Sequence, residues 1–357
     1  MNRSLWHGRR VLVTGHTGFK GGWLAMWLHE LGAEVTGFAL PAPTTPSLFE
    51  QARIAELVTH VEGDVREFVA FEHAIQAARP ELIFHLAAQP LVRASYADPV
   101  ETYATNVMGT VHLLDACRRL KGLRGVVCVT SDKCYDNREW DRPYREADPM
   151  GGHDPYSSSK GAAELAIASF RRSYFADGPL IASVRAGNVI GGGDWAEDRL
   201  VPDIVRAMLA GETPVIRAPR SVRPWQHVLD ALAGYLLVGE QLLKGDATAA
   251  SAWNFGPSDA DMRPVGSIVE ELLRLWGAEG WEASSAPQPH EAALLKLDSG
   301  KARSNLDWQP RLSLGKALAK VVEWHKGVAA GIDARDISVR QLRDYQVQDN
   351  LGQVKWA

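Results

Sequence analysis

Hydrophobic residues are grouped along this chain in short, almost continuous runs, and these runs alternate with longer stretches that have helical periodicity. The predicted helices include residues 21–32 and 107–120. Because the runs are apolar throughout, we expect strands that are buried on both faces. Their alternation with helices predicts an α/β fold with a doubly wound parallel sheet. The predicted strands are residues 10–15, 34–40, 60–65, 82–88, 125–131, 180–188 and 252–256.

The alternation of strands and helices thins out after residue 188, where the chain becomes richer in Pro, Gly and Trp. We expect residues 1–187 to form the larger domain, which the segment 225–256 completes. Residues 188–345 are expected to form a smaller, discontinuous α/β lobe over the carboxyl edge of the sheet. Residues 346–357 are predicted to be a poorly ordered tail.

Composition and charge narrow the possible partners. The 357 residues include 39 Lys plus Arg and 43 Asp plus Glu, which gives a net charge of −4 without a polybasic tract. We therefore expect neither nucleic acid nor an anionic membrane as partner. The sequence has no run of about 18 apolar residues, and its first residues lack the apolar core of a signal peptide. We expect a cytoplasmic protein.

The cysteines are Cys117, Cys128 and Cys134, an odd number without a CxxC pair. This pattern predicts no disulfide framework and suits a reducing compartment. Cys134 follows a group of polar residues, but we interpret it as a small filler because nothing nearby would serve as its base. We expect no metal site.

The segment VLVTGHTGFKGGWL places three glycines directly between the first strand and the first long helix. Gly15 permits a tight turn, Gly18 lets the backbone approach a pyrophosphate, and Gly21 lets the helix pack on the strand. The helix N-terminus favours the phosphate charge. In this position the glycines predict a dinucleotide site of the Rossmann type rather than a structural turn. The candidate contacts here and at the next strand ends are Gly15, Thr17, Gly18, Phe19, Lys20, Gly21, Asp64, Val65, Leu86, Ala87 and Ala88.

One feature of many NAD sites is missing from the segment GFALPAPTT, which follows the glycines by about 20 positions. It contains no acidic residue to bind the ribose 2′-hydroxyl. It contains no arginine for a 2′-phosphate either, since the next one is Arg53. We therefore expect the chain to bind NAD, and to bind it weakly.

Chemically active side chains follow the fifth strand and open a later helix. Tyr156 and Lys160 are four residues apart, so they share one helix face, and a nearby ammonium lowers the pKa of a phenol. A pair at this spacing often marks only a solvated helix face. Ser131 at the end of the fifth strand and the glycine loop upstream favour a catalytic pair. Asp132 and Lys133 follow Ser131 and add an acid and an amine.

Together, the glycine loop, Ser131, Tyr156, Lys160 and the segment NVMGT (106–110) resemble the extended short-chain dehydrogenase/reductase family. The resemblance covers residues 8 to 345. It is strongest to the nucleotide-sugar 4,6-dehydratases, most of which have Asp–Glu where this chain has Asp132–Lys133. The segments SDKCYDN, GNVIGGGDW, RPWQHV and PHEA are similar to those of enzymes that use CDP-glucose. The resemblance implies NAD as cofactor, Asn106 as a cofactor contact, and a role in making deoxysugars for cell-surface polysaccharide such as O-antigen.

The resemblance also implies a division of labour. Tyr156 removes the proton of the C4 hydroxyl, Ser131 hydrogen-bonds that oxygen, and Lys160 holds the nicotinamide ribose. Asp132 is expected to protonate the departing C6 oxygen. Lys133 is either the base at C5, for which it must be neutral, or a residue that pairs with Asp132 and only positions it.

Substrate contacts are expected mainly from the smaller lobe. A nucleotide diphosphate carries about two negative charges, which guanidinium forks bind in bidentate fashion. Each arginine taken alone is more typical of a protein surface. The candidates are Gln89, Arg93, Asn188, Arg199, Leu200, Arg217, Arg223, Trp225 and His290.

Two alternatives remain open. A nucleotide-sugar 4-epimerase needs Tyr156, Lys160 and Ser131, but it has no use for Asp132 and Lys133. A non-catalytic, NAD-sensing protein of the same fold typically lacks the Tyr–Lys pair. The resemblance further implies a homodimer or higher homo-oligomer, with a four-helix contact made by residues 107–120 and the helix after Tyr156.

Overall fold

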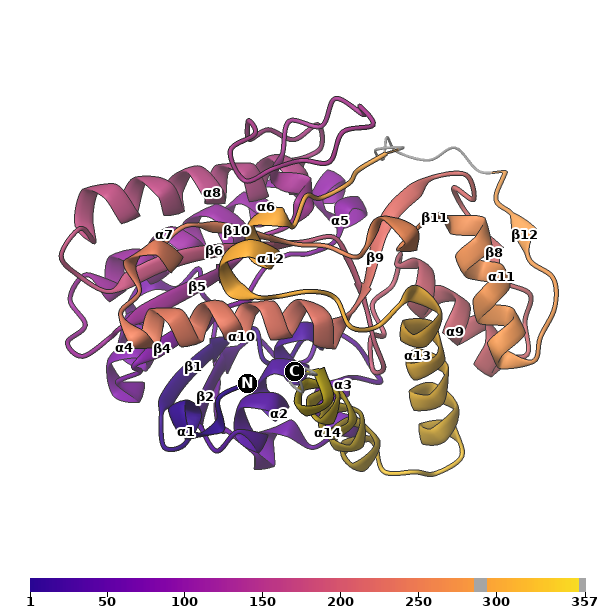
Figure 1. Ribbon diagram of the computed structural model, residues 1–357, viewed down its shortest axis with the longest axis horizontal. Coiled ribbons are helices and arrows are strands. Elements are labelled where there is room, and N and C mark those ends of the chain that lie inside the picture. The colour runs from indigo at the N-terminus through magenta and orange to yellow at the C-terminus, as the bar shows by residue number, and fades with distance from the viewer. Residues whose placement is uncertain (286–293, 353–357) are drawn as a thin grey trace, which may run out of the picture.

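The computed structural model describes residues 1–285 and 294–352, and side chains as far as residue 347 within the last helix. Its larger lobe is a seven-stranded sheet in the order β10-β6-β5-β4-β1-β2-β3, in which all neighbouring strands are parallel (Figure 1). The strands are β1 (Arg10–Thr14), β2 (Glu34–Ala39), β3 (Thr59–Glu62), β4 (Leu82–His85), β5 (Gly125–Val129), β6 (Leu180–Ala186) and β10 (Ala252–Phe255). The predicted doubly wound parallel sheet is confirmed.

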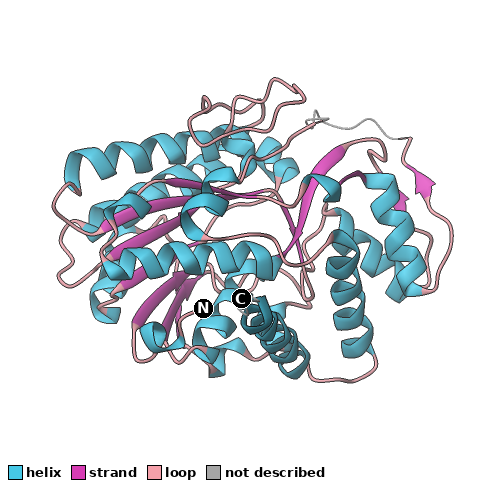
Figure 2. Ribbon diagram, in the orientation of Figure 1, coloured by secondary structure: helices cyan, strands magenta, loops and turns pink. Residues whose placement is uncertain are grey.

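Helices cover both faces of this sheet, as Figure 2 shows. The core on one face contains α2 and α10, and the core on the other contains α4, α7 and α8. Their bounds are α2 (Phe19–Glu30), α4 (Phe68–Ala78), α7 (Gly109–Cys117), α8 (Pro155–Tyr174) and α10 (Val228–Lys244). Residues 21–28 of α2 are all buried, which explains why this helix is apolar on every side.

The carboxyl ends of the strands position the site. The chain leaves β1 toward β2 and β3, and then returns to place β4 on the other side of β1. Ligands of open α/β sheets bind at such a switch point. Several strands end earlier than predicted, so that Gly15, Leu86, Ser131 and their neighbours lie in the loops beyond them. The helix α1 (Arg3–Trp6) precedes β1. Short helical elements elsewhere in the larger lobe are α3 (Leu48–Gln51), α5 (Val92–Ala97), α6 (Pro99–Tyr103) and a π-helical turn at Ala104–Met108.

The smaller lobe lies beyond this edge, to the right in Figure 1. It contains a three-stranded sheet of β7 (Asn188–Ile190), β9 (Val222–His227) and β11 (Met262–Pro264), and a parallel pair of β8 (Val215–Ile216) and β12 (Glu282–Ala283). Three helices enclose its core, α9 (Leu200–Ala210), α11 (Val265–Trp276) and α13 (Leu314–Ala329). These strands have two to six residues, which is too short for a clear period in the sequence.

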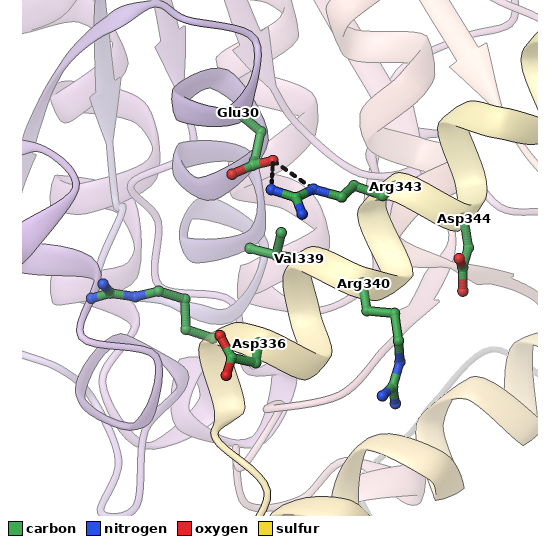
Figure 3. A pocket seen from close by; sticks show the side chains of 7 residues that line it. Glu30, Asp336, Val339, Arg340, Arg343 and Asp344 are labelled. Carbon is green, nitrogen blue, oxygen red and sulfur yellow. Dashed lines mark hydrogen bonds and ion pairs between the residues drawn. The ribbon is translucent and has the colours of Figure 1, made fainter.

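The C-terminal part differs from the expected domain boundaries. Helix α12 (Gly300–Leu306) contacts β10 and α10, and helix α14 (Ala334–Gly352) contacts α2 and α3, so both return to the larger lobe. Residues 346–352 continue α14, and the predicted tail therefore begins inside a helix; residues 353–357 lie outside the described part. Arg343 of α14 binds Glu30 at the end of α2, as Figure 3 shows. Contacts with α2 and α3, including this ion pair, hold α14 on the larger lobe.

A hollow of about 550 Å³ lies between α2 and α14, and its lining includes Arg335, Arg340 and Arg343 (Figure 3). Each of these arginines already pairs with a carboxylate, that of Glu56, Glu323 or Glu30, respectively. Within residues 1–285 and 294–352, no helix combines the length and the apolar character needed to cross a membrane. The same residues contain no cluster of three side chains suited to hold a metal ion.

Asp230 on α10 anchors the C-terminal segments. Its Oδ1 accepts hydrogen bonds from the backbone N–H of Arg311 and the hydroxyl of Tyr345, both at 2.8 Å, and its Oδ2 accepts one from the N–H of Leu312 at 3.2 Å. Burial raises the pKa of Asp230 to about 6, although these hydrogen bonds oppose the shift. The fold therefore holds a carboxyl group that is ionised only at a cost.

We expect Asp230→Asn to change the pH dependence of stability. An acid whose pKa is raised on folding stabilises the fold below its unfolded value, near pH 4, and this contribution is lost as the pH rises through 6. The stability of the wild type relative to the variant should therefore fall by up to about 3 kcal/mol between pH 4 and 7.5. Urea unfolding at several pH values measures the difference. Asp259→Asn, at an exposed carboxylate, is the control, and parallel curves for wild type and Asp230→Asn would contradict the expectation.

Candidate active site

Ser131 organises the turn at the carboxyl end of β5. It caps the 3-10 turn Asp132–Cys134, where its Oγ accepts a hydrogen bond from the N–H of Lys133 at 3.2 Å. The Ser131 hydroxyl also donates to Asp132 Oδ1 at 2.9 Å. This geometry turns Asp132 into the interior and leaves Lys133 half-buried.

Asp132 is a buried carboxyl group with one unused oxygen. Its Oδ2 has no hydrogen-bond partner among the described residues and lies against the backbone at Gly187. Burial raises the pKa of Asp132, although Lys133, Ser131 and Arg223 pull it down. The protonated form of Asp132 is therefore more accessible than that of an exposed aspartic acid, as donation of a proton requires. Among the described residues, no ion pair joins Asp132 to Lys133, which leaves the positioning alternative without a direct contact in its support.

Helix α8 brings Tyr156 and Lys160 to the same place. Asp154 caps the helix by accepting a hydrogen bond from the N–H of Ser157 at 2.9 Å, and the N–H of Tyr156 donates to Ser95 Oγ at 3.1 Å. Lys160 Nζ is 6.0 Å from the centre of the Tyr156 ring, and both side chains are buried. The two residues share one helix face, as predicted.

Burial governs the titration of these groups. It raises the pKa of Tyr156 to about 12, although a hydrogen bond with Ser131 and the charge of Arg199 act in the opposite direction. Burial, together with the neighbouring Lys20, lowers the pKa of Lys160 to about 7. Burial therefore dominates the pKa of Tyr156 in the protein alone, and the expected lowering by Lys160 stays a prediction. Burial and Arg199 likewise lower the pKa of Lys20 to about 8.

A buried ion pair that the sequence analysis missed lies beneath the site. Glu164 on α8 and Arg185 on β6 are joined at 2.7 Å, and both side chains are 4% exposed. Glu164 also accepts hydrogen bonds from the hydroxyls of Thr130 at 2.5 Å and Ser183 at 2.8 Å. Two signals in the sequence could have found the pair: Glu164 lies one turn after Lys160, and Arg185 interrupts an apolar strand.

The glycine loop has the geometry of an anion site. Gly15 has a φ of +74°, and a Cβ there would lie 2.7 Å from the backbone N of Ala87. A Cβ at Gly21 would lie 2.1 Å from the carbonyl oxygen of Gly15, whereas one at Gly18 would meet only ordinary contacts. Protein packing therefore requires glycine at 15 and 21 but not at 18. The first turn of α2 has neither a side-chain cap nor an acidic residue, so its N–H groups are available to a phosphate.

The β4 loop lies beside this turn. Thr14 Oγ1 accepts hydrogen bonds from the N–H groups of Leu86 and Ala87, both at 3.1 Å. Leu86, Ala87 and Ala88 are half-buried at the switch point. Of the other candidate cofactor contacts, Thr17 donates its hydroxyl to the carbonyl of Leu40 at 2.9 Å.

Asn106 and Gln89 are fully occupied within the protein. The Asn106 side chain accepts a hydrogen bond from the N–H of Gln89 at 2.9 Å and donates to the carbonyl of Gln89 and the hydroxyl of Ser159. The Gln89 side chain donates to Thr102 and accepts from the N–H of Leu91. These contacts brace the β4 loop against α8. The predicted roles of Asn106 in cofactor binding and of Gln89 in substrate binding stay predictions.

Three more candidates for the cofactor lie around the loop. Asp64 forms an ion pair with Arg66 at 2.6 Å, and Val65 is buried next to Gly109. The ring of Phe19 packs against Gly191, in the loop after β7. Contact of Asp64 and Val65 with the cofactor stays a prediction.

The arginines predicted for the substrate lie around Asp132 and along the lobe boundary. Arg223 is buried close enough to Asp132 to lower its pKa. Arg199 pairs with Asp194 at 3.0 Å, and Arg93 and Arg217 both pair with Asp198.

The remaining substrate candidates come from three elements. Asn188 opens β7 and is paired in register with Trp225 on β9, and Leu200 opens α9. Trp225 Nε1 is buried without a hydrogen-bond partner in the described structure. His290 lies outside the described residues.

Tyr235 on α10 is a further residue of the site that the sequence did not predict. Its hydroxyl is buried and has no hydrogen-bond partner among residues 1–285 and 294–352. Burial raises its pKa, and Tyr156 and Asp132 raise it further, so this phenol faces the same centre. No motif marks the residue, because helix α10 reads as an ordinary buried helix.

Comparisons with known proteins agree with this geometry. Residues 12–321 match the family model described as GDP-mannose 4,6 dehydratase. The CDP-glucose 4,6-dehydratase of Salmonella typhimurium is 51% identical over 97% of this chain and 98% of its own length. The UDP-glucose 4-epimerase of Mycolicibacterium smegmatis is 30% identical over 89% of this chain and 98% of its own length.

A solved structure gives the same picture. The dTDP-glucose 4,6-dehydratase DesIV of Streptomyces venezuelae, a double mutant with NAD and DAU bound, is 25% identical with a TM-score of 0.78, and the match covers 90% of this chain and 98% of that one. The chain therefore belongs to the GDP-mannose 4,6 dehydratase family, within the extended short-chain dehydrogenases/reductases that its motifs resemble.

Proposed function

We propose that this chain is an NAD-dependent CDP-glucose 4,6-dehydratase, which converts CDP-D-glucose to CDP-4-dehydro-6-deoxy-D-glucose and water. The observation that carries the proposal is Asp132, a buried carboxyl group beside Ser131 and Tyr156, with one oxygen that has no hydrogen-bond partner among the described residues. An epimerase has no use for such an acid. The 51% identity to a CDP-glucose 4,6-dehydratase supports the choice of nucleotide.

The glycine loop fits NAD. Gly18 is free of constraint from the protein, and the first turn of α2 offers uncapped N–H groups to a pyrophosphate. When bound, NAD accepts a hydride from C4 of the sugar and returns one to C6. The loop after β2 supplies no acid for the ribose, so weak binding is expected. Arg53 is engaged with Asp333 at 2.7 Å, which does not favour NADP.

Each side chain of the site has a separate role in the reaction. Tyr156 takes the proton of the C4 hydroxyl while Ser131 hydrogen-bonds that oxygen. Lys160 holds the nicotinamide ribose. The C4 ketone then makes the C5 proton acidic, and Asp132 protonates the departing C6 oxygen from its protonated form.

We assign the removal of the C5 proton to Lys133. It follows Asp132 on the same turn, and none of the described side chains forms an ion pair with it. Arg199, Arg223 and Asn188 provide the charge and polarity that a sugar diphosphate needs, together with Arg93 and Arg217. A cytoplasmic location stays a prediction.

Incubation of the protein with CDP-D-glucose and NAD should give a product lighter by one water, seen by mass spectrometry. The dTDP, UDP and GDP analogues should react more slowly. An isomer of unchanged mass would identify an epimerase, and binding of NAD without any product would favour a sensor.

Two variants separate the acid from the base. Asp132→Asn should slow water loss by about 10²- to 10⁴-fold, while C5 of recovered substrate still takes up deuterium from D₂O. Lys133→Met should abolish both water loss and C5 exchange. If Lys133 only positions Asp132, the Met variant will behave like Asp132→Asn, and near wild-type exchange in Lys133→Met would remove Lys133 from the role of base.

We further propose a homodimer through α8 and its neighbours. Apolar side chains are exposed on adjacent elements of one face, with Val100 and Tyr103 on α6, Met108 on the π-helical turn and Leu165, 62% exposed, on α8. Such a group of exposed apolar side chains is typical of a protein contact. The contact therefore includes α6, one element earlier than the sequence predicted.

Leu165→Glu should shift the protein toward monomers, because it places a charge in the contact. Light scattering after size-exclusion chromatography at micromolar concentration measures the mass. Leu209→Glu, at an exposed leucine of α9, should leave the mass unchanged. A monomeric wild type, or a dimeric Leu165→Glu variant, would contradict the proposal.

A further inference from the structure

Two arginines of the proposed substrate site donate to the same carboxylate oxygen. Arg93 Nη1 lies 2.8 Å from Asp198 Oδ1, and Arg217 Nη1 lies 2.6 Å from the same atom. Arg93 belongs to α5 of the larger lobe, whereas Asp198 and Arg217 belong to the smaller lobe (Figure 1). One carboxylate therefore links the two lobes next to the proposed site.

Arg217 is fully committed to this contact. Its Nη2 donates to the carbonyl oxygen of Asp198 at 2.8 Å and lies 3.5 Å from Asp203 Oδ2. A bidentate grip on a phosphate uses two N–H groups of the guanidinium, from both terminal nitrogens or from Nε and one of them. Arg217 can therefore bind a diphosphate in this way only by giving up at least one of its contacts with Asp198.

The loop presents the Asp198 carboxylate in an unusual way. The residue has a φ of +61°, a left-handed conformation that Asp, Asn and Gly adopt most easily. The next residue, Arg199, is fixed by Asp194. Although partial burial raises the pKa of Asp198, the hydrogen bond from Arg93 and the charge of Arg217 hold it below the ordinary value. The carboxylate is thus ionised at neutral pH.

We propose that Asp198 determines affinity in the substrate site by competing with the diphosphate for Arg93 and Arg217. The inference deepens the proposed function and rests on it. The ion pairs are 26 to 39% exposed, and pairs of this kind are individually weak. A diphosphate with about two negative charges can therefore displace a single carboxylate. Since substrate and product share the CDP group, the competition weakens the binding of both and favours release.

Calorimetric titration of the full-length protein with CDP tests the competition. Asp198→Asn removes the charge but keeps a residue that tolerates the left-handed backbone, so the fold is retained. We expect this variant to bind CDP about three- to tenfold more tightly than the wild type, with the gain reduced at high salt. The control is Glu197→Gln, which removes an exposed negative charge from the neighbouring position.

A double variant shows whether Asp198 acts through Arg217. In an Arg217→Met background, Asp198→Asn should tighten CDP binding by a smaller factor than it does in the wild type, since one of the released arginines is absent. Unchanged or weaker CDP binding by Asp198→Asn would overturn the inference, as would equal tightening by Glu197→Gln. If the wild type fails to bind CDP, the proposed function fails as well. If the wild type and Asp198→Asn bind CDP equally well, only the inference about Asp198 is overturned.

Discussion

The active centre depends on the ion pair between Glu164 and Arg185. The pair holds together three elements that lie far apart in the sequence, because Thr130 precedes Ser131 at the end of β5, Glu164 follows Lys160 on α8, and Arg185 lies on β6. Burying two charges is expensive, and it is tolerated only when every charged atom finds partners. Here Glu164 accepts four hydrogen bonds, and Arg185 also donates to the hydroxyl of Tyr135 at 2.7 Å. The turn at Asp132–Cys134 and helix α8 are thereby fixed relative to one another.

Burial also determines the direction of the pKa shifts of the side chains next to this pair. It raises the pKa of Asp132 and lowers that of Lys160, so the acid form of the carboxyl group is more accessible than in water and the ammonium is easily neutralised. Tyr156 resists ionisation for the same reason, and Ser131 and Arg199 only partly compensate. The positive charge of the nicotinamide ring of bound NAD⁺, next to the phenol, would lower the pKa of Tyr156. Burial thus acts on both Asp132, the proposed acid of the elimination, and Tyr156, the proposed base of the oxidation.

How far the sequence predicts such a site can be judged from particular residues. The strand pattern predicted that Ser131, Asp132 and the β4 loop lie along one edge, since carboxyl ends of parallel strands share an edge. The spacing of Tyr156 and Lys160 predicted a common face. Neither pattern reveals which carboxylate an arginine meets, and the partners Asp194 and Asp198 were missed because pairing depends on how loops cross in space. Helix α14 was missed because Asp230 and Glu30, over 100 residues away, hold it.

Two classes of ion pair therefore serve two purposes in this molecule. Glu164 and Arg185 are almost inaccessible, and removing either would leave a charge buried without a partner, so this pair does not exchange. The pairs on Asp198 share one oxygen, remain partly exposed and cost little to break. The first class lies where the reacting atoms must be held still. The second lies at the boundary of the lobes, beside the proposed substrate site, where weak pairs suit the exchange of substrate for product.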